Sequence, residues 1–360
     1  MSQRAKRRLL RGFVACCLIL IGGRSLLGET VVRPVIDAPS ETAYADAVVR
    51  ALDRAEHSIL ILLSNCELDS EGLVDRLIAA HQRGVSVRVL LDASDWETSI
   101  TERNRPVLDR LLAEGIEAAF DDPSVTAHAK LVVVDRRIVL LGSTHWNRYA
   151  LTDHRQADIW IEDGGIGEAF AEYVDRLWNG TLPEAGMVLP ERPDGATIVA
   201  LPDTDGTCLY GTTLLDLLRG AQRSIHAVLY RVSVYPQYQD SLSNDLVDAV
   251  CDAAARGLDV RVVIDDCRFY EESAAANLAS ALVMVERGVS VRFDEPGETT
   301  HAKLVLIDGE TTVIGSTNWN YYSLERNVET NVAILRVPEV AAPYEAYFEV
   351  LWSDGRPPGT

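Results

Sequence analysis

Lysine is almost absent from the body of this 360-residue chain. After Lys6, the sequence uses lysine only at Lys130 and Lys303, and arginine supplies every other basic side chain apart from histidine. Each of these two lysines stands two residues after a histidine, His128 or His301. An ammonium group is a compact point charge, whereas a guanidinium is a planar fork, so both positions favour a site that needs an ammonium donor. Two His-x-Lys units of this kind indicate a site that handles phosphate.

Positive charge is scarce overall. The formal net charge is -20 at pH 7, and the first 28 residues hold six basic residues and no acidic one, so the rest of the chain is more acidic still. Such a surface lacks the broad basic footprint that binds duplex nucleic acid. Nucleic acid is therefore a disfavoured partner, although two lysines and scattered arginines are enough to hold one phosphate group.

The N-terminal apolar run is short. It spans residues 12–23 and follows a basic stretch at 4–11, which is the order of a secretory signal peptide. A run of this length falls short of an ordinary membrane span. We therefore expect an exported protein, periplasmic or extracellular, with an uncleaved membrane anchor at residues 9–28 as the alternative.

Cysteine is sparse and irregularly spaced. Without the leader, Cys66, Cys208, Cys251 and Cys267 remain, and export would permit disulfides whose pairing the sequence leaves open. No CxxC pair or Cys/His cluster has the spacing of zinc ligands. We expect no metal and no cofactor.

The chain consists of two similar halves. HAKLVVVD (128–135) reappears as HAKLVLID (301–308), an offset of 173 residues, and Gly-Ser follows each copy at the same distance. A period this long means a duplicated domain rather than a solenoid. The predicted organisation is a leader at 1–28, a first lobe at 29–180, a Pro-, Gly- and Asp-rich linker at 181–207, and a second lobe at 208–360.

Each half also repeats one order of strands and helices. Strands that alternate with helices predict an α/β fold in which each sheet is flanked by helices. The predicted strands include 58–63, 158–162, 224–230, 328–335, the two segments that open at the His-x-Lys units, and those that end at Asp92 and Asp265. The predicted helices include 72–83, 166–178, 244–256 and 342–352.

The paired motifs suit phosphodiester chemistry. Residues i and i+2 of a strand point to one face, so His128 and Lys130 lie side by side, as do His301 and Lys303. Phosphodiester cleavage needs a nucleophile at phosphorus and a proton for the leaving alkoxide. One half supplies only one of these, whereas two halves that face each other supply both. The lysines would stabilise charge on the non-bridging oxygens.

The two motifs resemble those of the phospholipase D superfamily. HAKLVVVD…GST and HAKLVLID…GSTN both match its pattern of His-x-Lys, four residues, Asp, six residues and Gly-Ser, and the repeat extends the similarity over most of residues 40–355. The resemblance implies two pseudo-symmetric α/β/α sandwich lobes, an active site between them, a phosphohistidine intermediate and no required metal.

The resemblance also implies roles for individual residues. His128 would be the nucleophile and His301 the general acid and base, while an acidic residue after each motif would orient the opposite histidine. Glu329 fits that place in the second half, and Asp158 is the first-half candidate. The residues expected to contact the phosphate are Lys130, Lys303, Asn318, Ser143, Ser316 and His145. Those expected to be structural are Asp135 and Asp308.

The first motif departs from this pattern. Where the second half has Asn318, the first has His145, and the positions of Asn327 and Glu329 are taken by His154 and Gln156. A histidine still donates to a phosphate oxygen, so the departure predicts an asymmetric site rather than an inactive one.

The leading functional hypothesis is a phospholipase D-type phosphodiesterase that hydrolyses phospholipid head groups. Transfer of phosphatidyl groups, as in cardiolipin synthesis, is a close variant. The rivals are a nuclease of the same superfamily and a degenerate member that binds a phosphate ligand without turnover. We expect a phospholipid substrate at a membrane surface and a monomeric protein.

Overall fold

The computed structural model describes residues 30–95, 97–181, 197–238 and 240–359. The expected leader at 1–28 and much of the expected linker lie outside these ranges. No helix within them combines the length and the apolar character needed to cross a bilayer.

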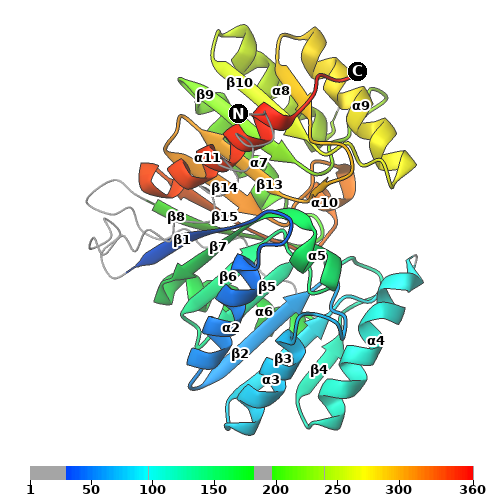
Figure 1. The fold of residues 1–360 in the computed structure, drawn as a ribbon, viewed down its shortest axis with the longest axis vertical. Coiled ribbons are helices and arrows are strands. Elements are labelled where there is room, and N and C mark those ends of the chain that lie inside the picture. Colours follow the sequence, from blue (N-terminus) through cyan, green and yellow to red (C-terminus); the bar gives the residue numbers. More distant parts are fainter. Residues whose placement is uncertain (1–29, 96, 182–196, 239, 360) are drawn as a thin grey trace, which may run out of the picture.

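Two β-sheets form the centres of two lobes (Figure 1). The first sheet runs in the order β1 (Val31–Asp37), β7 (His154–Glu162), β6 (Ile138–Gly142), β5 (Lys130–Val134), β2 (Ser58–Leu63), β3 (Ser86–Leu91) and β4 (Glu117–Phe120). The second runs in the order β11 (Ser290–Phe293), β10 (Asp259–Ile264), β9 (Ser224–Leu229), β13 (Lys303–Ile307), β14 (Thr311–Gly315), β15 (Glu329–Leu335) and β8 (Thr197–Asp203). The expectation of two α/β lobes is confirmed.

The two His-x-Lys strands lie at equivalent places inside their sheets. β5 pairs antiparallel with β2 and β6, and β13 pairs antiparallel with β9 and β14. Every residue of both strands is buried. A strand covered on both faces needs a continuous apolar run rather than an alternating one, which explains Leu-Val-Val-Val and Leu-Val-Leu-Ile after the lysines.

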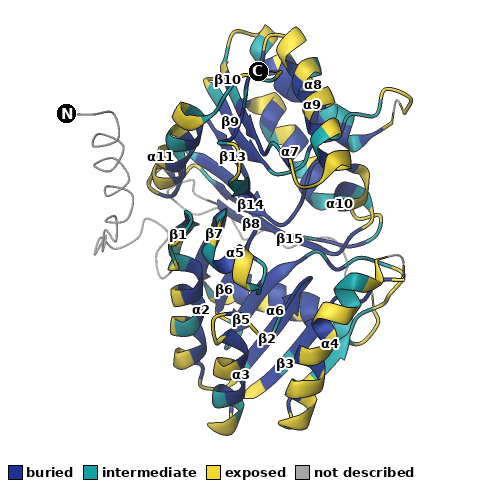
Figure 2. Ribbon diagram, turned by 45° about the vertical axis from the view of Figure 1, so that its right-hand side comes forward, coloured by how far each residue is buried: buried dark blue, intermediate teal, exposed yellow. Residues whose placement is uncertain are grey.

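Helices cover the sheets and turn their exposed faces outward, as Figure 2 shows. The first-half helices are α2 (Ala43–Arg54), α3 (Leu73–Gln82), α4 (Thr98–Ala113), α5 (Arg148–Thr152) and α6 (Gly164–Trp178). The second-half helices are α7 (Leu209–Gly220), α8 (Leu242–Ala255), α9 (Glu271–Glu286), α10 (Tyr321–Glu325) and α11 (Pro338–Asp354). Each predicted helix is present, and α3 and α8 end before Gly84 and Gly257, both in the left-handed conformation.

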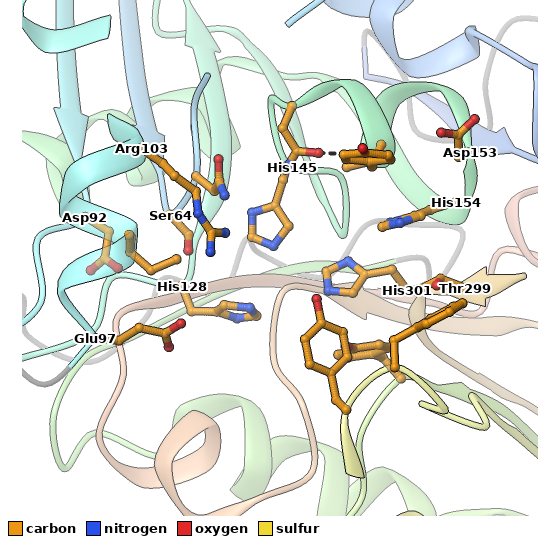
Figure 3. A pocket seen from close by; sticks show the side chains of 18 of the residues that line it. Ser64, Asp92, Glu97, Arg103, His128, His145, Asp153, His154, Thr299 and His301 are labelled. Carbon is orange, nitrogen blue, oxygen red and sulfur yellow. Dashed lines mark hydrogen bonds between the residues drawn. The ribbon is translucent and has the colours of Figure 1, made fainter. Parts of the chain in front are cut away.

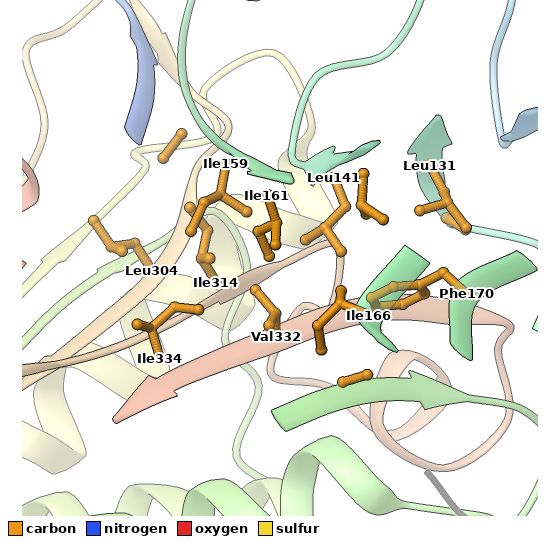
Figure 4. Close-up of a cluster of buried hydrophobic side chains, with 14 of the residues drawn as sticks. Leu131, Leu141, Ile159, Ile161, Ile166, Phe170, Leu304, Ile314, Val332 and Ile334 are labelled. Atoms are coloured by element: carbon orange, nitrogen blue, oxygen red, sulfur yellow. The ribbon is translucent and has the colours of Figure 1, made fainter. Parts of the chain in front are cut away.

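A hydrophobic core is shared between the lobes (Figure 4). It joins side chains of the first sheet, such as Ile161, to side chains of the second, such as Ile314 and Val332. The helix that closes each half also reaches the other sheet, since α6 contacts β8 and α11 contacts β1. The lobes therefore form one body with their sheets facing each other.

The predicted linker is too long. Residues 197–203 form β8, which pairs antiparallel with β15 along its whole length, and Ala200 and Leu201 are fully buried. The segment Thr-Ile-Val-Ala-Leu is apolar enough to join the sheet, so the second lobe includes Thr197 and the boundary at 208 is wrong.

Disulfides were left open by the sequence. Cys66, Cys208, Cys251 and Cys267 are all free thiols in the structure, and all but Cys208 are buried.

Candidate active site

Each His-x-Lys segment is held by the opposite lobe. The backbone N–H of His128 donates to the carbonyl of Val328, just before β15, with an N···O distance of 2.9 Å. The N–H of His301 donates to the carbonyl of Arg155, in β7, also at 2.9 Å. The short strand β12 (Thr299–Thr300) adds a parallel pairing with β7. These crossed contacts bring both histidines to one cleft between the lobes.

Two buried aspartates fix the backbone just before each histidine. Asp92 accepts the N–H of Ala127 at 2.7 Å, and Asp265 accepts the N–H of Thr300 at 2.6 Å. Burial raises the pKa of Asp92 to about 7, against the opposing effect of the bond to Ala127. Both aspartates follow the ends of strands β3 and β10, so the sheet itself sets where the motif segments begin.

The motif aspartates serve the far end of the same strands. Asp135 accepts the backbone N–H groups of residues 56–58, and Asp308 accepts those of residues 222–224. Each aspartate thereby ties the turn after the motif strand to the start of its neighbour, β2 or β9. The structure places both in the structural position expected from the sequence.

His128 contacts an acidic residue of the other lobe. Its Nδ1 lies 3.1 Å from each carboxylate oxygen of Glu329, which is fully buried. Burial raises the pKa of the Glu329 carboxyl, but His128, Lys130 and the hydroxyl of Ser316 outweigh it, so the net pKa is lowered. A carboxylate at Nδ1 makes that nitrogen the protonated one and leaves the Nε2 lone pair for a substrate.

His301 has a different partner. Its Nδ1 lies 2.9 Å from the carbonyl oxygen of Ser143, and a carbonyl only accepts, so Nδ1 carries the proton. The prediction that Asp158 orients His301 is therefore wrong. Asp158 instead accepts from the Thr144 hydroxyl at 2.6 Å and from its N–H at 3.1 Å. The Tyr230 ring packs edge-on against His301 at 4.5 Å between centroids.

The two motif serines do not face the cleft. Both are fully buried. The hydroxyl of Ser143 donates to the side-chain oxygen of Gln156 at 2.7 Å, and that of Ser316 donates to Glu329. Each hydroxyl thus positions the residue that stands 13 places further along the chain, and the expected contact of these serines with a phosphate stays a prediction.

The glycine before each motif serine lets its strand lie unusually close to the neighbouring strand. A Cβ on Gly142 would lie 2.4 Å from Asp158 Oδ1 and 2.5 Å from its Cα. A Cβ on Gly315 would lie 2.2 Å from Asn331 Oδ1 and 2.5 Å from the Thr330 carbonyl oxygen. No side chain fits at either position, so the Gly-Ser pair lets strands β6 and β14 press against β7 and β15.

Both lysines are buried beneath the histidines. Lys130 Nζ donates to the carbonyl of His128, and Lys303 Nζ donates to the carbonyl of His301. Burial lowers the pKa of Lys130 to about 7, although Glu329 and Asp92 oppose the shift. Burial also lowers the pKa of Lys303 well below its ordinary value, and Lys130 adds to the effect. An anion in the cleft would favour the charged form of both amines.

His145 stands with the other two histidines. Its ring centroid is 5.8 Å from that of His128 and 5.1 Å from that of His301. One nitrogen from each of the three rings falls within 4.8 Å of the others. Burial lowers the pKa of all three imidazoles, of His145 and His301 furthest. The equivalent residue of the second half, Asn318, is buried, and its side-chain oxygen has no partner among the described residues.

A cavity of about 630 Å³ opens onto these rings. Figure 3 shows His128, His145 and His301 around it, with Arg103 and Glu97 at one side. Its wall also includes Tyr149, Tyr230, Phe269 and Tyr270. Sequence reasoning missed Arg103 and the Ser143 carbonyl. Arg103 lies outside the repeated motifs, and residue types do not indicate which backbone carbonyl will accept a hydrogen bond from a site residue.

The facing lobes and the crossed His-x-Lys segments define a member of the phospholipase D superfamily. More narrowly, the family model described as "Cardiolipin synthase, PLD-like domain" matches residues 48–178 and 214–352, and the chain belongs to that family.

Among curated proteins, the chain is 24% identical over 314 residues to cardiolipin synthase A of Shigella boydii serotype 4, with 80% of this chain and 63% of that protein covered. Cardiolipin synthase A of Escherichia coli O157:H7 matches over the same extent and at the same identity. The chain thus spans under two thirds of the length of these relatives.

A solved structure of similar fold is phosphatidylserine synthase of Haemophilus influenzae Rd KW20. Its TM-score is 0.71 at 13% identity, with 90% of this chain and 87% of that chain covered. At this identity the likeness establishes the fold alone, and one fold hosts many reactions.

Proposed function

We propose that this chain transfers phosphatidyl groups between alcohols through a phosphohistidine at His128. The observation that carries the proposal is the convergence of two differently held histidines on one cavity. His128 is held by a carboxylate and His301 by a carbonyl, and nitrogens of the two rings fall within 4.8 Å of each other. A phosphorus atom between them would meet a nucleophile on one side and a proton donor on the other.

The first half-reaction forms the covalent intermediate. His128 Nε2 attacks the phosphorus, the bond from phosphorus to the leaving alcohol oxygen breaks, and that oxygen takes a proton from Nε2 of the His301 imidazolium. Glu329 stabilises the positive charge that develops on the His128 ring. The negative phosphate favours the protonated form of His301, which burial and Lys303 disfavour in its absence.

The second half-reaction restores the enzyme. An acceptor hydroxyl gives its proton to His301, its oxygen attacks phosphorus, and the P–N bond to His128 breaks. An alcohol acceptor gives a new phosphodiester, whereas water gives phosphatidic acid. The kinship to the cardiolipin synthase family favours an alcohol, so hydrolysis becomes the competing outcome of the same intermediate.

Product analysis tests the proposal. Full-length protein is incubated with a chelator and either phosphatidylcholine vesicles plus glycerol or phosphatidylglycerol vesicles alone, and the lipids are separated by mass. A transferred phosphatidyl group supports the proposal, and phosphatidic acid alone would make the protein a hydrolase. Nicking of single-stranded DNA without lipid turnover would favour a nuclease, and no product from either substrate would favour a binding protein.

A labelling experiment assigns the two histidines. With phospholipid labelled at the phosphatidyl phosphorus, His301→Asn should retain acid-labile label on the protein, and His128→Asn should retain none. The reverse pattern would exchange the two roles. His57→Asn serves as the control, since His57 is exposed and lies outside the cavity.

A further inference from the structure

Three histidines face one another in this cleft, and the third is a feature of this chain's first motif. The repeat places His145 opposite Asn318, so an imidazole stands where the other half has an amide. One ring nitrogen from each of His128, His145 and His301 falls within 4.8 Å of the others. Three imidazoles this close form a set of neutral nitrogen donors.

Two of the three rings are already oriented as metal ligands usually are. A histidine that binds a metal through one nitrogen almost always donates its other N–H to a carboxylate or a backbone carbonyl. His128 has Glu329 at Nδ1, and His301 has the Ser143 carbonyl there. Both rings therefore present Nε2 with a fixed tautomer and a fixed plane.

The third ring is not held in this way. Nδ1 of His145 is buried and has no hydrogen-bond partner. A buried nitrogen without a partner costs free energy, and a bound ligand would remove that cost. Bonds of 2.0–2.1 Å in a tetrahedron place the nitrogens about 3.3 Å apart. The rings must therefore approach one another, and His145 gives up no Nδ1 hydrogen bond by turning.

We propose that His128, His145 and His301 form a binding site for a borderline transition-metal ion such as Zn²⁺ or Co²⁺, and that the bound ion blocks phosphoryl transfer. Imidazole nitrogens suit these ions, whereas Mg²⁺ and Ca²⁺ require oxygen ligands. The ion would be an inhibitor rather than a cofactor, because it occupies the His128 lone pair that attacks phosphorus.

Charge sets the strength of this site. Glu329 is the buried carboxylate in contact with the triad and favours a cation through His128. Lys130 and Lys303 lie under the same histidines, and these basic side chains oppose a second cation. We therefore expect a reversible site that is weaker than a structural zinc centre.

Cobalt spectroscopy tests binding without reference to activity. Co²⁺ is titrated into full-length, chelator-treated protein, and its visible d–d bands report nitrogen ligation at low coordination number. We expect saturation at one ion per chain and displacement by Zn²⁺. His145→Asn, which restores the residue of the second half, should weaken binding by at least tenfold, and Glu329→Gln should weaken it about 10- to 100-fold.

The control substitution is His154→Asn. His154 lines the same cavity, with its ring centroid 6.3 Å from that of His301, but it lies outside the triad. It should leave the cobalt affinity unchanged. Equal affinity in wild type and His145→Asn, or a loss in His154→Asn as large as in His145→Asn, would overturn the proposed ligand set. Circular dichroism checks that each variant is folded.

The inhibitory part rests on the proposed function and is measured separately. Zn²⁺ should abolish lipid turnover by wild type, chelator should restore it, and His145→Asn should require at least tenfold more Zn²⁺ for the same fractional loss. Undiminished turnover at Zn²⁺ concentrations that saturate the protein would overturn the inhibitory role. A protein without any lipid turnover would refute the proposed function, and the cobalt titration would still decide the site.

Discussion

His128 Nδ1 lies 3.1 Å from both carboxylate oxygens of Glu329, although 201 residues separate the two in the chain. The contact crosses from one lobe to the other, because His128 belongs to the segment before β5 and Glu329 opens β15. His301 has no such carboxylate, since the equivalent of Glu329 in the first half is Gln156 and the Ser143 carbonyl takes the place at Nδ1. This asymmetry supports the proposal that His128 is the nucleophile.

Glu329→Gln should lower the turnover number by roughly 10²- to 10⁴-fold. The amide keeps the shape of the side chain but removes the charge that stabilises the His128 imidazolium. Glu272→Gln is the control, because that side chain is 93% exposed. Initial rates of lipid turnover under saturating substrate measure the effect, and a variant that keeps a tenth of the wild-type rate would refute the role given to Glu329.

Part of this site follows from the sequence and part does not. The constant offset places both histidines and both lysines, because these side chains recur in the repeat, whereas Glu329 follows from the resemblance to the phospholipase D superfamily. The offset of 173 residues pairs Glu329 with Gln156. Asp158, two residues further on, was predicted instead because it is the acidic residue nearest to that position. Asp158 matches Asn331, and both serve the threonine after the motif serine. Its type suggested catalysis, whereas its place in the repeat indicates packing.

The fold, too, follows from the sequence only in part. The motif strands β5 and β13 and their neighbours β2 and β9 were predicted, and the outer strands β1 and β8 were not. Each of these edge strands contains a proline, Pro34 or Pro202, a residue that sheets tolerate at an edge but that weakens the strand signal. Each also ends in an aspartate, Asp37 or Asp203, that accepts backbone N–H groups at the start of the next helix. Their pairing with β7 and β15 is a long-range contact that local pattern does not specify.

Asp158→Asn should make the protein more stable than wild type as the pH rises. Burial raises the pKa of Asp158 from 3.8 to about 7, although the bonds from Thr144 lower it. A raised carboxyl pKa contributes stability that is complete below the unfolded value and is lost as the pH rises through the folded value. Asn331 shows that an amide fits the equivalent place in the second half.

Denaturant unfolding at several pH values measures this effect. Between pH 5.5 and 7, the free energy of unfolding of Asp158→Asn relative to wild type should rise by about 1.4 kcal/mol per pH unit, and above pH 7 the difference should level off. A difference that stays constant over the whole range would show that Asp158 does not titrate there.

Leu304→Ala should destabilise both lobes together. Leu304 is fully buried in the core that the two sheets share. Removing a buried leucine side chain costs about 2–5 kcal/mol from lost transfer free energy and the cavity left behind. Leu282→Ala in α9 is the matched control, because that leucine is 50% exposed and should cost under about 0.5 kcal/mol. Thermal unfolding followed by two probes, one in each lobe, should give one shared midpoint, and two separate transitions would show that the lobes unfold independently.

Gly315→Ala should disable the site by moving β15. A Cβ there would lie 2.2 Å from Asn331 Oδ1 and 2.6 Å from Asn331 Cα, so the strand that carries Glu329 must shift. Forcing a methyl group into such packing costs about 1–3 kcal/mol, and the shift would also draw Glu329 away from His128. Gly220→Ala is the control, because a Cβ at that helix end meets nothing within 4 Å and alanine is favoured there by about 0.5–1 kcal/mol. Unfolding midpoints and turnover are measured for both variants. Full turnover in Gly315→Ala would mean that the two strands tolerate a wider separation than the packing around Gly315 implies.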